Sequence, residues 1–120
     1  MPAASIQSLS GFLTSSKQTL TLGSFREPRK VLRAHIEVIT GFNSDGTDQI
    51  RIGHNTDDDA YVTLTAVNAA GIQTVTLGTG VGYDATPREV IAQYVNGGSE
   101  PSQGSAIVTL EVLPCPPNPA

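Results

Sequence analysis

Hydrophobic and polar residues alternate along several short stretches of this chain, and the longest such run lies between residues 31 and 40. Its apolar positions lie two residues apart, and so do the polar positions between them. They are Leu32, Ala34, Ile36 and Val38 on one side, and Arg33, His35 and Glu37 on the other. A period of two with β-branched residues predicts a strand with one buried and one solvated face.

A polar stretch with an Asp-Gly pair follows this run. Asp45 and Gly46 lie within it, and a second alternating run over residues 49–53 comes directly afterwards. An Asp-Gly pair between two strand-like runs is a strong signal for a tight turn. The pattern therefore predicts a β-hairpin in which Gly46 has a positive φ angle.

Further strand candidates follow at a regular spacing, separated by clusters of Gly, Asn, Asp and Pro. The full set covers 30–40, 48–53, 60–67, 72–78, 88–95 and 105–113. Such spacing without a helical pattern is typical of antiparallel sandwiches and jelly rolls. The type of secondary structure is undecided only for residues 86–95: we favour a strand, but Thr86-Pro87 resembles the start of a helix. The expected fold class is all-β, an antiparallel and jelly-roll-like β-sandwich with an extended N-terminal arm.

The first 28 residues differ from the rest, because they are rich in Ser and Thr and their apolar residues are irregularly spaced. Residues 17–22 alternate and could form an edge strand, and Pro28 then interrupts any ladder because it lacks an N–H. We expect three parts: an arm with a possible edge strand (1–28), a β-sandwich domain (29–113) and an extended Pro-rich tail (114–120). The arm has too many apolar residues to stay in water, so we expect these to bind a partner: Ile6, Leu9, Phe12, Leu13, Leu20, Leu22 and Phe25.

Composition narrows the classes of partner. The chain has 120 residues, 38% of them apolar and 5% aromatic, which predicts one domain with an aliphatic core. Its net charge of −4 argues against a nucleic-acid partner, which would need a basic stripe. No apolar run approaches the roughly 20 residues of a membrane span, and the N-terminus lacks signal-peptide features. The single cysteine, Cys115, cannot form an internal disulfide. We expect neither nucleic acid nor membrane as a partner.

Candidate catalytic and metal-binding residues are few. His54 followed by Asp57, Asp58 and Asp59 is the most site-like cluster, since imidazole and carboxylates can hold a divalent cation. A solvated acidic turn is the simpler interpretation, because consecutive residues rarely converge on one ion. Neither histidine lies in a nucleophile-elbow motif, and Cys115 has no neighbour that would activate its thiol. The sequence therefore predicts no enzyme, no catalytic residue, no cofactor and no metal site.

The order of several short segments resembles one group of viral proteins. A strand ending HIEV leads into GFNSDGTD, then IRIG, an acidic turn and YVTL, and PSQGSA precedes the final strand. Over about residues 31–113 this pattern resembles the small β-rich structural proteins of tailed bacteriophage virions. Those proteins decorate or cement the capsid, or form head fibres and tail components.

The resemblance implies a capsid decoration or cement protein that stabilises the shell by binding the major capsid protein or a neighbouring virion structural protein. It also implies assembly in the host cytoplasm, a place in the virion and a homo-oligomer, with a trimer favoured. The alternative is a tail or fibre β module that binds a receptor or carbohydrate. Such modules expose aromatic rings for sugar stacking, and this chain has only three Tyr and three Phe. Head and tail locations both stay open.

Overall fold

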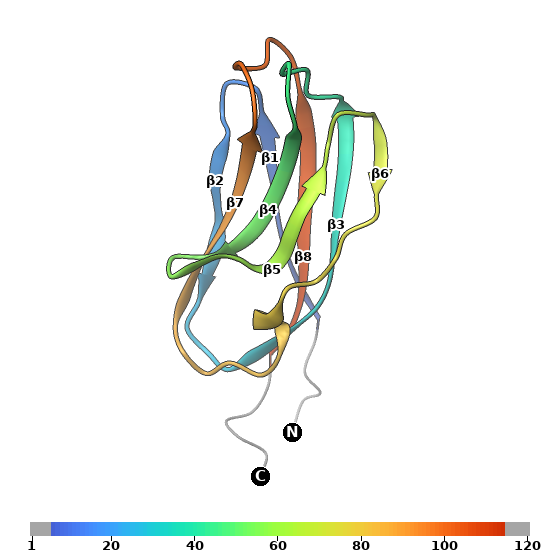
Figure 1. Cartoon of the computed structure of the whole chain (residues 1–120). Coiled ribbons are helices and arrows are strands. Elements are labelled where there is room, and N and C mark those ends of the chain that lie inside the picture. The colour runs from blue at the N-terminus through green and yellow to red at the C-terminus, as the bar shows by residue number, and fades with distance from the viewer. Residues whose placement is uncertain (1–5, 115–120) are drawn as a thin grey trace.

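The computed structural model describes residues 6–114, which form eight strands and one short 3₁₀ helix (Figure 1). The elements are β1 (Gln7–Thr14), β2 (Thr19–Phe25), β3 (Arg29–Thr40), β4 (Asp48–His54), β5 (Asp57–Ala66), β6 (Gly71–Gln73), η1 (Thr79–Val81), β7 (Arg88–Asn96) and β8 (Ser105–Pro114). The segment left open between strand and helix is therefore the strand β7. No helix in this described part of the chain is long and apolar enough to cross a membrane.

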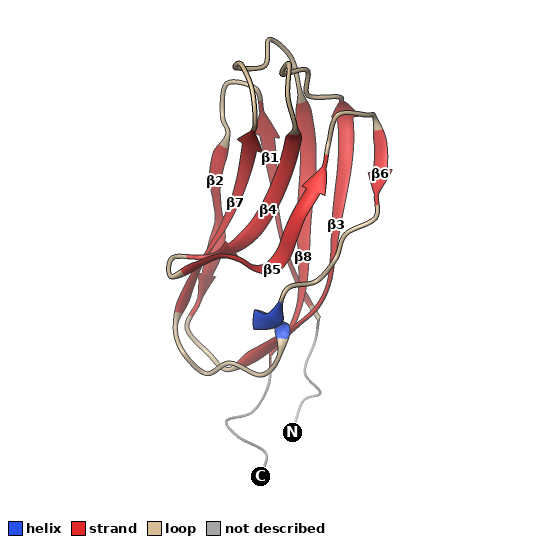
Figure 2. Cartoon of the chain, in the orientation of Figure 1, coloured by secondary structure: helices blue, strands red, loops and turns tan. Residues whose placement is uncertain are grey.

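The strands form two antiparallel sheets that face each other (Figures 1 and 2). Sheet A has the order β1-β8-β3-β6, and sheet B has the order β2-β7-β4-β5. Most consecutive strands lie in opposite sheets, which is the connectivity of a double-sheet jelly roll. The predicted all-β, jelly-roll-like sandwich is confirmed.

The core lies between the sheets and follows the predicted alternation. On β8 the buried residues are Ala106, Val108, Leu110 and Val112, and on β3 they include Ala34, Ile36 and Val38. The register of β3 against β8 shifts between Val31 and Arg33. This irregularity places Val31 in the core instead of the predicted Leu32.

The predicted hairpin over residues 31–53 is wrong. β3 pairs with β8 and β6 in sheet A, whereas β4 pairs with β5 and β7 in sheet B. Each strand has one apolar face, and both faces are buried when the connection crosses from one sheet to the other. Gly46 also lacks the predicted positive φ: among residues 6–114, the glycines with positive φ are Gly71 and Gly104.

The structure also corrects most of the predicted arm. β1 pairs with β8 from Gln7 to Thr14, and β2 pairs with β7, so these segments are the edge strands of the two sheets. The expected edge strand is therefore present as β2, but the arm is part of the sandwich. Its irregular apolar spacing has two causes: Gly11 takes an inward position of β1, against Leu20 and Leu22, and β2 contains a register shift. Of the predicted Pro-rich tail, Pro114 ends β8, and residues 115–120, with Cys115, lie outside the described residues.

Candidate functional site

The seven apolar residues predicted to bind a partner are split by the structure. Leu13 and Phe25 are buried in the core. Leu9, Leu20 and Leu22 are partly buried and pack against it. Only two of the seven are largely exposed, Ile6 and Phe12. The fold therefore uses five of these side chains for its own core and leaves two for contact with another molecule.

Phe12 belongs to an exposed apolar surface on the outer face of sheet A. Phe12 pairs with Ile107, Ile107 pairs with Glu37, and Glu37 pairs with Ile72, so these four residues form one row across the sheet. Ile39 follows two residues after Glu37 on β3. The sheet A patch, as we call it, consists of the exposed side chains of Phe12, Ile39, Ile72 and Ile107. Ile72 is 78% exposed, which is unusual for isoleucine in a folded domain.

Next to the sheet A patch, the same face carries a small charged network. The Arg33 Nε donates to Glu111 Oε1 at 2.6 Å, and His35 Nε2 lies 2.8 Å from Glu111 Oε2. These two contacts hold the pKa of Glu111 below its ordinary value, and the hydrogen bond from Arg33 makes the larger contribution. The outer face of sheet A thus combines a polar half with a mainly apolar half, in which Glu37 lies between Ile107 and Ile72.

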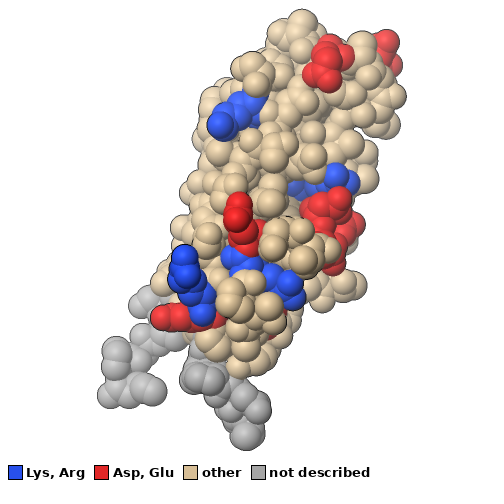
Figure 3. Space-filling model, turned by 90° about the vertical axis from the view of Figure 1, so that its left-hand side faces the viewer, with Lys and Arg blue, Asp and Glu red and all other residues tan. Residues whose placement is uncertain are grey.

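Sequence reasoning missed a second charged network, at the end of the strands opposite to the sheet A patch. Many acidic and basic side chains lie side by side in the lower half of the face in Figure 3. Asp84 Oδ2 lies 3.3 Å from Arg29 Nη2 and 3.1 Å from Arg88 Nε. Burial opposes the ionisation of Asp84 most strongly. The Thr86 amide and the two guanidinium groups outweigh it and hold the pKa of Asp84 below its ordinary value.

This second network fastens the long connection between β6 and β7 to the sandwich. The backbone of Arg29 exchanges two hydrogen bonds with that of Asp84, at 3.0 and 3.1 Å. The Arg29 side chain is almost fully buried, and its Cζ lies 4.6 Å from the centre of the Phe25 ring. Asp84 and Arg88 are four residues apart, which the sequence could have indicated. Arg29, however, is 55 residues from Asp84 in sequence, so only the fold reveals this contact.

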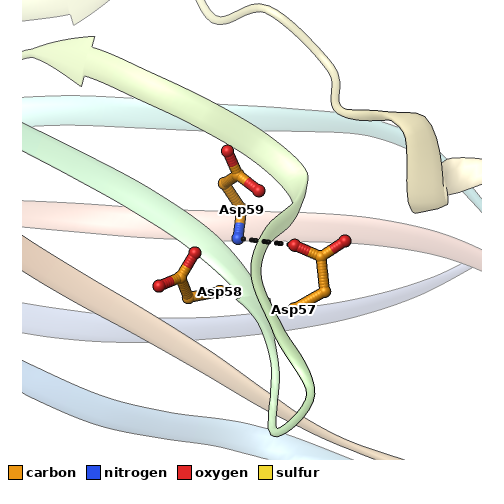
Figure 4. A group of neighbouring side chains, drawn as sticks. All are labelled: Asp57, Asp58 and Asp59. Carbon is orange, nitrogen blue, oxygen red and sulfur yellow. Dashed lines mark hydrogen bonds between the residues drawn. The ribbon is translucent and has the colours of Figure 1, made fainter.

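His54 and the three aspartates do not form the joint site that their sequence suggested. Carboxylate oxygens of Asp57, Asp58 and Asp59 lie within 4.8 Å of one another, in a group that does not include the His54 imidazole. Figure 4 shows the Asp59 amide donating to Asp57 Oδ1, at 3.4 Å. The Asp57 carboxyl raises the pKa of Asp59. All three side chains are exposed, so a solvated acidic turn remains our prediction.

His54 has a structural environment instead. Its Nδ1 accepts a hydrogen bond from the Thr56 amide at 3.2 Å, and its ring packs edge-on against Tyr61 at 5.6 Å. Burial, with a contribution from Arg88, lowers the pKa of His54. A hollow of about 380 Å³ opens beside it, but Arg88 and Asp84 on its wall are already paired with each other. The prediction of no catalytic residue therefore stays as it was.

The fold is shared with chains in several bacteriophage capsids. A chain in the capsid asymmetric unit of cyanophage Pam1 matches with a TM-score of 0.62 and 13% identity, over 94% of this chain and 87% of that one. A chain in the capsid of Ralstonia phage GP4 matches with a TM-score of 0.62 and 12% identity, over 97% of this chain and 88% of that one. A chain in the acidic stable capsid of Helicobacter pylori bacteriophage KHP30 matches with a TM-score of 0.63 and 8% identity, over 93% of this chain and 90% of that one.

No family model and no curated protein matches the sequence. At 8–13% identity, the three structural matches show a common fold. They confirm, at the level of the fold, the resemblance to small β-rich phage structural proteins.

Proposed function

We propose that this protein is a structural component of a bacteriophage virion, namely a capsid decoration or cement protein that binds the major capsid protein. The observation that carries the proposal is the match with chains in three phage capsids. It covers at least 93% of this chain and at least 87% of each matched chain. The likeness therefore extends over most of this chain and most of each matched chain.

The sheet A patch is the surface that we assign to contact with the shell. It replaces the seven-residue arm as the proposed binding surface, and Phe12 is common to both. Exposed apolar groups that lie together on one face of a monomer are often sites of protein contact. Burying Phe12, Ile39, Ile72 and Ile107 against a capsid protein would stabilise the joint between them. Repetition over a shell would multiply a contact that is weak in a single copy.

The proposed role is structural and not enzymatic, and it places the protein in the virion. It includes self-association, for which the resemblance to phage structural proteins favoured a trimer. In this role the protein stabilises the shell through the surface area that it buries and through close packing. The role therefore needs neither a cofactor nor a catalytic group.

A tail or fibre module that binds a receptor or carbohydrate is less well supported. Four of the six aromatic side chains are buried. Phe42 stacks on Tyr94 with ring centres 4.4 Å apart, and Phe25 meets Tyr61 edge-on at 6.2 Å. Only Phe12 and Tyr83 remain exposed, and sugar-binding surfaces usually need more rings than these. We therefore favour decoration of the head.

Co-sedimentation with phage heads that lack this protein tests the proposal. Wild-type protein should sediment with the heads, and Ile72→Asp should bind at least about tenfold more weakly, because a carboxylate would be buried in an apolar contact. Leu64→Asp is the matched control, since Leu64 is an exposed apolar residue on sheet B, and it should bind like the wild type. Failure of the wild type to bind would contradict the decoration role. Equal binding by all three would contradict the sheet A patch as the contact.

A further inference from the structure

The sandwich has four edge strands, and β1 differs from the other three. β6 contains only three residues, and β2 has a register shift between Thr21 and Gly23. The outer side of β5 is covered by the segment that follows β6: the Gly78 amide donates to the Tyr61 carbonyl, and the Thr63 amide to the Thr76 carbonyl. β1 is a regular eight-residue strand that ends the order of sheet A.

The hydrogen bonds at the end of β1 show which backbone groups face its open side. The Ser15 amide donates to Gly104, next to β8, whereas the N–H and C=O of Thr14 both bond to Lys17. In a strand, residues two apart direct their N–H and C=O groups the same way. The backbone groups of Ser8, Ser10 and Phe12 therefore point away from β8. Within residues 6–114, no strand lies on that side.

β1 also lacks the features that usually protect an edge. Its sequence, QSLSGFLT, contains no charged residue and no proline, and its register with β8 is continuous. Natural proteins block open edges with lysine, proline, bulges or a covering segment. Figure 3 views the molecule from the side on which β2 lies in Figure 1, and most charged side chains on this face gather in its lower half. A long, regular and uncharged edge is a template for another strand.

We propose that β1 pairs antiparallel with β1 of a second copy of this chain, across a two-fold axis at Ser10. The three open residues are symmetric about Ser10, so Ser8 of each copy lies opposite Phe12 of the other, and Ser10 lies opposite itself. Each of the three pairs exchanges two backbone hydrogen bonds. No like charges meet, because β1 has none. The two copies of sheet A then form one continuous sheet.

A second copy fits this edge better than an unrelated strand, because all the open groups of β1 are satisfied by β1 itself. The contact involves one strand edge and its flanking side chains, so it is smaller than the roughly 1,600 Å² of a standard interface. It therefore gives a concentration-dependent dimer, in place of the trimer that the resemblance to phage structural proteins favoured. The inference rests on the backbone edge of β1 and not on binding to a shell, although Phe12 belongs both to this edge and to the sheet A patch.

Sedimentation velocity of the full chain, over a range of concentrations, tests the pairing. The wild type should reach twice its 12.5 kDa monomer mass. Ser10→Lys and Ser10→Asp should each be monomeric, because like charges would face each other on the axis. An equimolar mixture of these two variants should form dimers again, because the opposite charges then meet. Recovery in the mixture also shows that both variants are folded.

Thr109→Lys is the matched control, since Thr109 is the neighbour of Ser10 on β8 and is not at the edge. It should dimerise like the wild type. A wild type that stays monomeric at every concentration would overturn the proposal. This holds even if β1 then pairs with a strand of another protein. A trimer, or a mixture of Ser10→Lys and Ser10→Asp that stays monomeric, would overturn it as well.

Discussion

Gly46→Ala is expected to destabilise the protein, although Gly46 does not have the φ angle that its sequence context predicted. A Cβ at this position would lie 2.7 Å from the carbonyl carbon of Gly97 and 2.8 Å from the Gly98 nitrogen. Ordinary carbon contacts begin near 3.5 Å, so the loop between β3 and β4 and the loop between β7 and β8 would have to separate by about 0.8 Å.

Two hydrogen bonds oppose that separation. The Gly97 amide donates to the Thr47 carbonyl at 2.9 Å, and the Ser99 amide donates to Asp45 Oδ1 at 2.5 Å. Forcing extra atoms into a packed site typically costs about 1–3 kcal/mol. For a chain of this length, a loss of about 2 kcal/mol corresponds to a melting temperature lowered by roughly 8 °C.

Thermal unfolding followed by circular dichroism measures the effect, and Gly82→Ala is the matched control. A Cβ on Gly82 meets no heavy atom within 4 Å, and the φ of this glycine is −68°, which alanine adopts freely. Its melting temperature should therefore be unchanged or slightly raised. Equal melting temperatures for the wild type and Gly46→Ala would refute the close approach of the two loops, and so would an equal loss in both variants.

Three further results are expected. Asp84→Asn should lower the free energy of unfolding in urea by about 1–3 kcal/mol, because Arg29 keeps a buried charge without its carboxylate. Since the pKa of folded Asp84 lies below 3.8, its contribution is complete above that pH and is lost below it. Wild type and Asp84→Asn should therefore converge in stability on acidification, and a constant difference would contradict the ion pair. Replacing Asp57, Asp58 and Asp59 together by Asn, or adding a chelator, should leave the melting temperature unchanged; a rise of several degrees with Ca²⁺ would reveal a cation site. A chain that begins at Arg29 should not fold, because it lacks β1 and β2, and a cooperative β-rich melt would contradict the pairing of these strands.

Local patterns predicted the strands well where one face of a strand is buried by the sandwich. The predicted alternation over Ala106–Val112 is found unchanged in β8. That strand lies between two others in sheet A, and one of its faces packs against the core. The same reasoning identified β7, where two periods competed. It misjudged the first 28 residues, because Gly11 and the register shift in β2 break the apolar period there.

Contacts between distant segments could not be predicted in this way. The Asp-Gly pair at residues 45–46 does lie in the connection between two strands, but the sequence does not say which sheet the next strand joins. Asp84 gains its role from Arg29, on a strand that is far away in sequence. The sheet A patch likewise depends on the register that brings Phe12, Ile107 and Ile72 into one row. Such pairings follow from the topology, which local residue patterns specify only in part.

Quantitative mass spectrometry of purified virions tests the central proposal most directly. The proposed role predicts that this chain is present in the particles, in a fixed ratio to the major capsid protein, and that it remains with heads from which the tails have been removed. Absence from the purified particles would contradict the role in the virion. Recovery only in the tail fraction would contradict decoration of the capsid.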